Sequence, residues 1–175
     1  MYFEYGEKEL IYLKQKDKRL AEVIDQVGMI ERTVDDDLFS SVVLHIVGQQ
    51  ISTKAQATIW QRMKDYLGTV DADTILNAGV EHLQPLGISF RKAEYITDFA
   101  EKVKDGSFDI EGIWKKSDEE AIEELSSLKG IGVWTAEMIL LFCMQRPNVL
   151  SFGDLAIQRG MRMIYHHRKI DRKLF

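Results

Sequence analysis

Apolar and polar residues follow each other along most of the chain with the three- and four-residue spacing of an amphipathic helix. One apolar stripe shows this spacing clearly: Phe90, Ala93, Ile96, Ala100 and Val103. Ser89 stands before the stripe as a candidate N-cap, and Gly106 stands after it as a stop signal. This segment is therefore predicted to be one helix with an apolar face turned to a core.

Similar patterns predict three more helices, at 37–48, from Ile51 to about Tyr66, and from Ser117 to Leu128. The last begins with a capping box, in which Ser117 and Glu120 can satisfy each other's backbone donors. No alternating run is long enough for a confident strand, although residues 2–5 can be extended. The pattern predicts an all-α protein of roughly ten short helices with short connections and one domain, 1–175.

Composition narrows the class of protein. The chain is 45% hydrophobic and 29% charged, which is typical of a soluble globular protein. No apolar run approaches the roughly 20 residues of a membrane span, and the N-terminus lacks the pattern of a signal peptide. Cys143 is the single cysteine, which excludes an internal disulfide, a zinc site of several thiolates and a four-cysteine cluster. We expect a cytoplasmic protein, associated with the nucleoid if the source is a prokaryote.

Charge is distributed unevenly. Residues 159–175 hold six basic side chains and one acidic one, whereas the whole chain has a net charge of −5. The remainder of the chain is therefore acidic, and the basic segment can steer an anionic partner or simply form a solvated helix face.

A short glycine-rich connection, Lys129-Gly-Ile-Gly132, joins the helix ending near Leu128 to one predicted from Val133 to about Met144. Two glycines allow a sharp reversal and leave backbone N–H groups uncovered at the positive end of a helix. Such a turn can bind a phosphate. It can equally be a plain helical hairpin with a glycine C-cap, in which Ile131 anchors the turn to the core.

Four ordered motifs, spread from about Phe39 to Arg172, carry a resemblance to a known family. They are the hairpin followed by Trp-Thr-Ala, the segment from Pro147 to Arg159 with its Asp154, the segment His45–Ser52, and the segment Leu86–Ala93. Together they resemble the helix-hairpin-helix DNA glycosylase superfamily, closest to the 3-methyladenine DNA glycosylase II branch in a short form without the N-terminal β-domain. Val133 departs from that pattern, since proline is common there.

The resemblance implies a multi-helix domain of two helical lobes with the hairpin beside an interlobe cleft. The central lobe is expected at about 38–145, with 1–37 and 146–175 forming the second lobe. It also implies a monofunctional DNA glycosylase in base excision repair that flips out alkylated purines of the 3-methyladenine and 7-methylguanine type. The alternatives are a glycosylase for other damaged or mismatched bases, or a non-catalytic DNA-binding module.

Asp154 is the catalytic residue that the resemblance implies. Hydrolysis of a glycosidic bond passes through an oxocarbenium-like sugar, which a nearby carboxylate stabilises, and the same carboxylate can orient the attacking water. Asp154 also lies at the start of a predicted helix, Leu155–Tyr165, so it can be an N-cap alone or do both.

Trp134 occupies the position at which backbone-cutting relatives carry a Schiff-base lysine. Tryptophan has no amine, so this chain is expected to leave an abasic site without cutting the strand. Its ring can face a cationic base in the substrate pocket, or it can be an ordinary core residue.

The partner that the resemblance implies is double-stranded DNA containing alkylated bases, bound by a monomer, with no membrane partner. Gln50 is the candidate for filling the gap that a flipped base leaves, although a glutamine can also simply cap a loop. The expected DNA contacts are Gly130, Ile131, Gly132, Thr135, Gln50, Ser52 and Lys129. The histidines lack metal-ligand spacing, so no metal and no cofactor are expected beyond a monovalent cation that hairpin carbonyls can hold.

Overall fold

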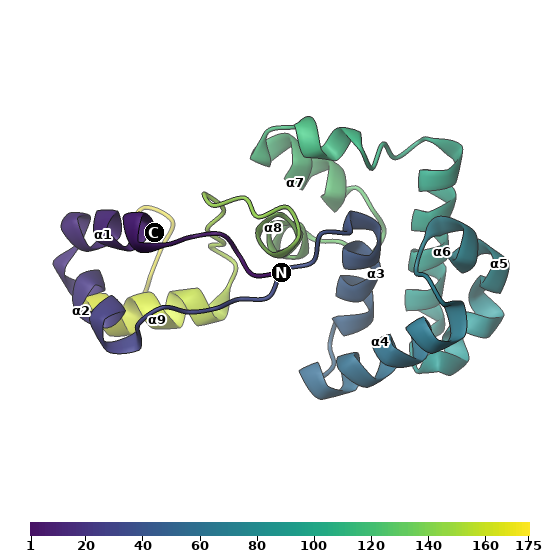
Figure 1. Ribbon diagram of the computed structural model, residues 1–175, viewed down its shortest axis with the longest axis horizontal. Coiled ribbons are helices and arrows are strands. Elements are labelled where there is room, and N and C mark those ends of the chain that lie inside the picture. The colour runs from purple at the N-terminus through teal and green to yellow at the C-terminus, as the bar shows by residue number, and fades with distance from the viewer. The chain divides into compact units, whose positions relative to one another are not determined.

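The computed structural model describes residues 1–175 and contains nine α-helices and two short 3-10 helices, with no strand longer than an isolated bridge (Figure 1). This confirms the all-α prediction. Contacts divide the chain into two compact units: unit 1 comprises 1–34 and 147–175, and unit 2 comprises 35–146. No helix is both long enough and apolar enough to cross a membrane.

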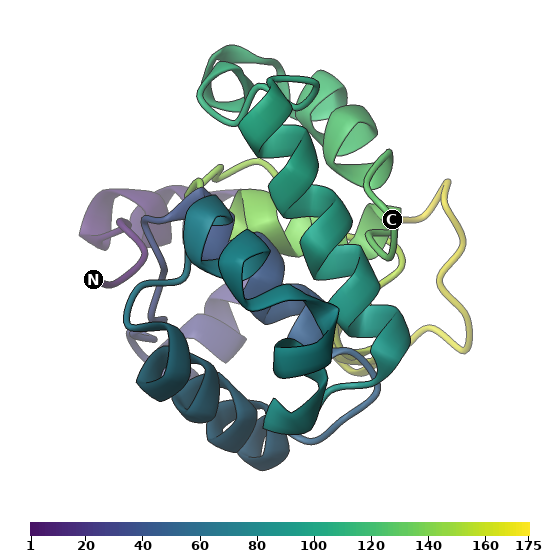
Figure 2. The ribbon, with the colours of Figure 1, turned by 90° about the vertical axis from the view of Figure 1, so that its right-hand side faces the viewer.

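Unit 2 contains six α-helices and both 3-10 helices. They are α3 (Leu38–Gly48), α4 (Thr53–Leu67), α5 (Ala72–Leu83), η1 (Gln84–Leu86), α6 (Phe90–Asp105), η2 (Gly112–Lys115), α7 (Asp118–Ser126) and α8 (Val133–Phe142). Helix α6 packs along α5, α7 pairs with α8, and α3 contacts both α6 and α8 (Figure 2). Helix α3 therefore lies at the centre of this unit.

The core of unit 2 forms where the apolar faces of these helices meet. Phe99 of α6 stacks on Phe39 of α3 with ring centroids 4.8 Å apart, and it forms a T-shaped pair with Phe108 with centroids 5.6 Å apart. Ile46 and Ile139 have no exposed surface. Because burial of each such side chain contributes about 1.5–3 kcal/mol, this core fixes how α3, α6 and α8 are placed around one another.

The caps predicted at Ser89 and Ser117 are confirmed on α6 and α7. Helices α3 and α4 begin at Leu38 and Thr53, one and two residues after the predicted starts, because Asp37 and Ser52 cap them. Helix α7 ends at Ser126, two residues before the expected end, because the chain already tightens into the turn that leads to the hairpin.

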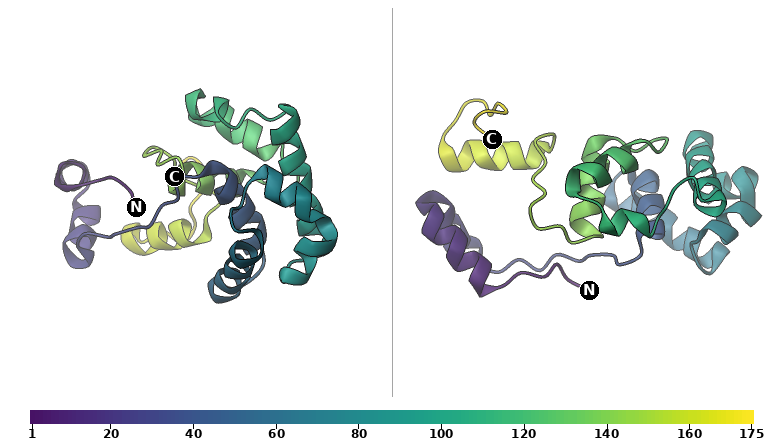
Figure 3. Two further views of the ribbon diagram at one scale, coloured as in Figure 1. Left: turned by 45° about the vertical axis from the view of Figure 1, so that its right-hand side comes forward. Right: turned by 90° about the horizontal axis from the view of Figure 1, so that it is seen from above.

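Unit 1 contains α1 (Glu7–Lys16), α2 (Lys18–Val27) and α9 (Leu155–Tyr165), seen again from two sides in Figure 3. Asp17 ends α1 and caps α2, and its Oδ2 accepts a hydrogen bond of 2.7 Å from the Tyr165 hydroxyl. Arg19 donates to the Tyr165 carbonyl oxygen at 3.1 Å. An antiparallel bridge between Tyr2 and Thr33 closes the extended N-terminal segment. Side chains from both ends of the chain therefore hold this unit together.

Candidate functional site

The hairpin between α7 and α8 has the glycine geometry that the sequence predicts. Gly130 has a φ of +83°, which a residue with a side chain rarely adopts. Ile131 is only 4% exposed and anchors the turn in the core, so the DNA contact expected at Ile131 has almost no accessible surface. Gly132 is the N-cap of α8, and no side chain caps this helix. The positive end of the α8 dipole is thus left to a partner outside the helix.

The two glycines have different steric surroundings. A Cβ on Gly130 would collide with the ring of Tyr95, which comes from α6. A Cβ on Gly132 would have no atom within 4 Å. Gly130 is therefore required by packing within the protein, whereas the space beside Gly132 is open.

The first turn of α8 presents aromatic and apolar surface. Val133 is 57% exposed and Trp134 is 47% exposed, so Trp134 is not a core residue, which was the alternative to a base-facing role. Thr135 differs from expectation, because the whole residue is only 6% exposed. The DNA contact expected at Thr135 therefore has almost no accessible surface.

Lys129 lies at the hairpin but is engaged within the protein. Its ammonium group pairs with Oδ1 of Asp98 on α6, and Lys102 lies 3.2 Å from Oδ2 of the same carboxylate. The Lys129 interaction, followed by that of Lys102, holds the pKa of Asp98 below its usual range. The pair raises the pKa of Lys129 in turn. The predicted contact between Lys129 and DNA therefore competes with Asp98.

The turn between α3 and α4 carries Gln49, Gln50 and Ser52. Gln50 is exposed, whereas Gln49 is half-buried. Gln50 has a φ of +58°, one of three non-glycine residues in the left-handed region. The Ser52 hydroxyl oxygen accepts a hydrogen bond of 3.2 Å from the N–H of Ala55. The turn thus projects Gln50 outward next to a helix N-terminus.

Lys92 and Gln49 connect this turn to the hairpin. The Lys92 ammonium group donates to the carbonyl oxygens of Val47 at 2.8 Å and Gln49 at 2.6 Å. The Gln49 side chain donates to the carbonyl oxygen of Gly130 at 2.6 Å. Sequence reasoning gave Lys92 and Gln49 no role, although both lie in motifs that carry the family resemblance. One hairpin carbonyl is therefore already used, and the hairpin cation stays a prediction.

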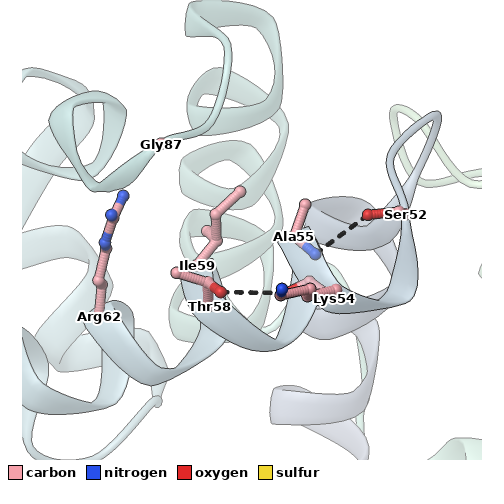
Figure 4. A pocket seen from close by; sticks show the side chains of 7 residues that line it. All are labelled: Ser52, Lys54, Ala55, Thr58, Ile59, Arg62 and Gly87. Atoms are coloured by element: carbon pink, nitrogen blue, oxygen red, sulfur yellow. Dashed lines mark hydrogen bonds between the residues drawn. The ribbon is translucent and has the colours of Figure 1, made fainter.

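A shallow, open depression of about 420 Å³ lies beside the turn between α3 and α4 (Figure 4). Lys54 and Arg62 contribute its cations, Ser52 and Thr58 its hydroxyls, and Gly87 part of its far side. The depression could not be predicted from the sequence, because it forms only where folding brings residues 52–62 together with Gly87.

Asp154 lies in unit 1 as the N-cap of α9. Its Oδ1 accepts hydrogen bonds from the N–H groups of Ala156 at 2.7 Å and Ile157 at 3.0 Å. The carboxylate is partly exposed, and it lies at the positive end of the α9 dipole. The capping interpretation of Asp154 is therefore confirmed, and its catalytic role stays a prediction.

The basic segment 159–175 presents all its cations to solvent. None of its six basic side chains forms an ion pair with a carboxylate. Arg172 lies over the ring of Phe152, 4.8 Å from its centroid, and the edge of that ring meets Phe175 at 5.3 Å. The end of the chain is therefore packed against the loop that leads to Asp154.

No three His, Cys, Asp or Glu side chains are grouped so that they can hold a metal ion. Cys143 is buried, and burial raises the pKa of its thiol to about 12. It is therefore a protonated core residue at neutral pH.

Comparison with known proteins agrees with the order and placement of these elements. The model of the HhH-GPD superfamily of base excision DNA repair proteins matches residues 43–174. The chain belongs to this superfamily. The match includes the α3–α4 turn, the hairpin and Asp154, so all three lie in the family's shared region.

Three relatives illustrate the likeness. DNA-3-methyladenine glycosylase 1 of Schizosaccharomyces pombe is 29% identical over 97% of this chain and 76% of its own length. The crystal structure of a DNA-3-methyladenine glycosidase from Bacillus halodurans is 34% identical, with a TM-score of 0.85 over 99% of this chain and 82% of that one. A Schizosaccharomyces pombe 3-methyladenine DNA glycosylase in complex with abasic DNA is 28% identical, with a TM-score of 0.76 over 95% and 84%.

Proposed function

We propose that this protein is a monofunctional DNA-3-methyladenine glycosylase of base excision repair. It binds duplex DNA as a monomer, turns an alkylated purine out of the helix, hydrolyses its N-glycosidic bond and leaves an abasic site. The observation that carries the proposal is the combination, in one member of the superfamily, of an uncapped Gly130–Gly132 hairpin with a carboxylate at the start of α9. We place the protein in the compartment that holds the DNA.

The hairpin supplies the grip on the strand in this proposal. The N-terminus of α8 offers backbone N–H groups and a positive dipole to a phosphate, and the open space beside Gly132 lets the phosphate approach closely. Such a contact carries no sequence information, so it holds damaged and undamaged duplex alike.

Base recognition is assigned to Trp134. Alkylation at a ring nitrogen leaves the purine positively charged and electron-poor. The face of an exposed indole attracts such a ring electrostatically and by stacking. Trp134 is 47% exposed, so part of its surface faces solvent.

Bond cleavage is assigned to Asp154. As the C1′–N bond lengthens, positive charge develops on the sugar, and the carboxylate stabilises it. The carboxylate then orients a water molecule and takes up its proton as the C1′–O bond forms. Because its Oδ1 is fixed by two backbone N–H groups, the carboxylate is held in place before the substrate arrives.

The product is proposed to be an uncut strand. Cutting requires an amine that attacks C1′ and holds the sugar as an imine, and Trp134 supplies none. The test is a duplex with one 7-methylguanine, incubated with the protein and then divided. One half is heated in alkali and the other is not, and a parallel sample receives borohydride.

We expect free 7-methylguanine, strand breaks only after alkali, and no borohydride-trapped adduct. Absence of free 7-methylguanine here, together with absence of free 3-methyladenine from methylated DNA, would refute the glycosylase proposal. Release of the base together with a nick before alkali, or with a trapped adduct, would refute only its monofunctional part.

A further inference from the structure

The backbone at Gln50 is held in an unfavourable conformation. A φ of +58° is common for glycine but rare for glutamine, so surrounding contacts must impose it. Gln50 itself is exposed, which means that the imposing contacts come from its neighbours and not from its own side chain.

The neighbour that can impose this geometry is Lys92. Its ammonium group is within hydrogen-bond distance of two carbonyl oxygens, Val47 at 2.8 Å and Gln49 at 2.6 Å. These carbonyls belong to the C-terminal end of α3, where backbone acceptors lack helical partners and a cation is favoured by the dipole. The lysine thus fixes the peptide units directly before Gln50.

The same face of α6 also supports the hairpin. Tyr95 follows Lys92 by three residues, so both side chains lie on one side of the helix. The Tyr95 ring fills the space that a Cβ on Gly130 would need. Gln49, whose carbonyl accepts from Lys92, donates its side-chain amide to the Gly130 carbonyl oxygen at 2.6 Å. A continuous chain of contacts therefore joins Lys92, Gln49 and Gly130.

We infer that Lys92 is a positioning residue that fixes the Gln50 turn and, through Gln49, locks it to the Gly130–Gly132 hairpin. The side chain that fills the gap left by the flipped base and the turn that grips the phosphate then move as one body. Lys92 does not touch the DNA in this arrangement, because its ammonium group is directed at two backbone carbonyls. The inference rests on the proposed function for its catalytic consequence.

The mutation Lys92→Met keeps the length and apolar stem of the side chain and removes the donor. Lys115→Met is the matched control, because Lys115 is exposed on η2 and forms no ion pair. Excision of 7-methylguanine from a duplex is measured in single turnovers at saturating protein. We expect Lys92→Met to lower the rate by roughly tenfold, the scale of coupled contacts in one hydrogen-bond network, and Lys115→Met to leave it unchanged.

A double-mutant cycle separates positioning from a general loss of stability. If Lys92 acts through Gln50, then Lys92→Met should cost little more in a Gln50→Ala background than Gln50→Ala costs alone. Full additivity of the two losses would overturn the inference, and so would a Gln50→Ala variant with the wild-type rate.

Hydrogen–deuterium exchange of the free protein provides a test that does not need activity. In Lys92→Met, the amides of residues 49–53 and 130–133 should both exchange faster than in wild type. In Gln49→Leu, which removes only the link to the Gly130 carbonyl, the hairpin amides should be affected most. Unchanged exchange in both variants would overturn the inference, whereas a wild type that releases no base would overturn the proposed function and leave the exchange result to be judged separately.

Discussion

Replacement of Asp154 by asparagine isolates the charge of this carboxylate from its role as a helix cap. Both capping hydrogen bonds, from Ala156 and Ile157, are accepted by one oxygen, Oδ1. Asparagine retains one carbonyl oxygen and is as good an N-cap as aspartate. The variant should therefore fold with nearly the wild-type free energy of unfolding while it lacks the negative charge that the proposed mechanism places beside the sugar.

The expected loss of activity in Asp154→Asn is that of the charge alone, because the helix cap is retained. Removing one electrostatic partner of a transition state lowers the rate by about 10²–10³-fold, or about 2.7–4 kcal/mol. Asp154→Ala loses the charge and the cap together, which costs about 1 kcal/mol of stability as well. The two variants should thus be equally slow in base release, whereas only the alanine variant should melt at a lower temperature.

The assay is single-turnover release of 7-methylguanine, run beside thermal melting and binding to a duplex with an abasic-site analogue. Asp37→Asn is a matched control, because Asp37 caps α3 through the same pair of backbone contacts and is not among the predicted site residues. It should excise bases at the wild-type rate. An Asp154→Asn protein with more than about a tenth of wild-type activity would refute the electrostatic role, and so would loss of activity that simply follows loss of folding.

Three further predictions follow from the hairpin and from one half-buried histidine, His45. Gly132→Ala should weaken binding to damaged and undamaged duplex equally, with no change in melting temperature. Gly130→Ala should weaken binding in the same way and also lower the melting temperature. Normal binding by Gly132→Ala would show that no phosphate approaches there. Asp98→Asn should tighten binding to undamaged duplex at low salt, because it frees Lys129 and removes a negative charge. DNA titrations at two salt concentrations check this, and unchanged affinity would contradict it. Burial lowers the pKa of His45, so below about pH 6.5 the unfolded state binds more protons than the folded state, and stability falls as the pH falls through that range. Between pH 7.5 and 5.5, His45→Gln should therefore show a smaller drop in melting temperature than the wild type. A drop equal to that of the wild type would refute the assignment.

Local signals in the sequence were sufficient to predict the hairpin and helices α3, α4, α6, α7, α8 and α9, but not α1, α2 or α5. Ser52, Ser89 and Ser117 cap their helices because a serine hydroxyl directly before a helix can accept a hydrogen bond from a backbone N–H of the first turn, which has no partner within the helix. The inward direction of Ile131 was predictable for a similar reason, since an apolar residue between two turn glycines gains most by burial.

Contacts between distant segments were not predictable from such signals. Lys92 is 43 residues from Gln49, with which it shares a hydrogen bond, and no local pattern distinguishes it from the other lysines of α6. The Lys129–Asp98 pair spans 31 residues and places a carboxylate beside an expected DNA contact. Thr135 was expected to contact DNA because the sequence alone does not show which face of α8 packs against the core.

The construction of unit 1 from both ends of the chain has a consequence for how the protein is made. Tyr165 bonds to Asp17 across 148 residues, and Arg19 bonds to the Tyr165 carbonyl across 146. Unit 2 is continuous, so it can fold while the ribosome, adding about 5–20 residues per second, is still synthesising the remainder. Unit 1 cannot close until 147–175 have emerged, and Asp154 belongs to that last segment. A nascent chain therefore completes the Gly130–Gly132 hairpin before it acquires Asp154, the proposed catalytic carboxylate, and a stalled translation product would lack that carboxylate.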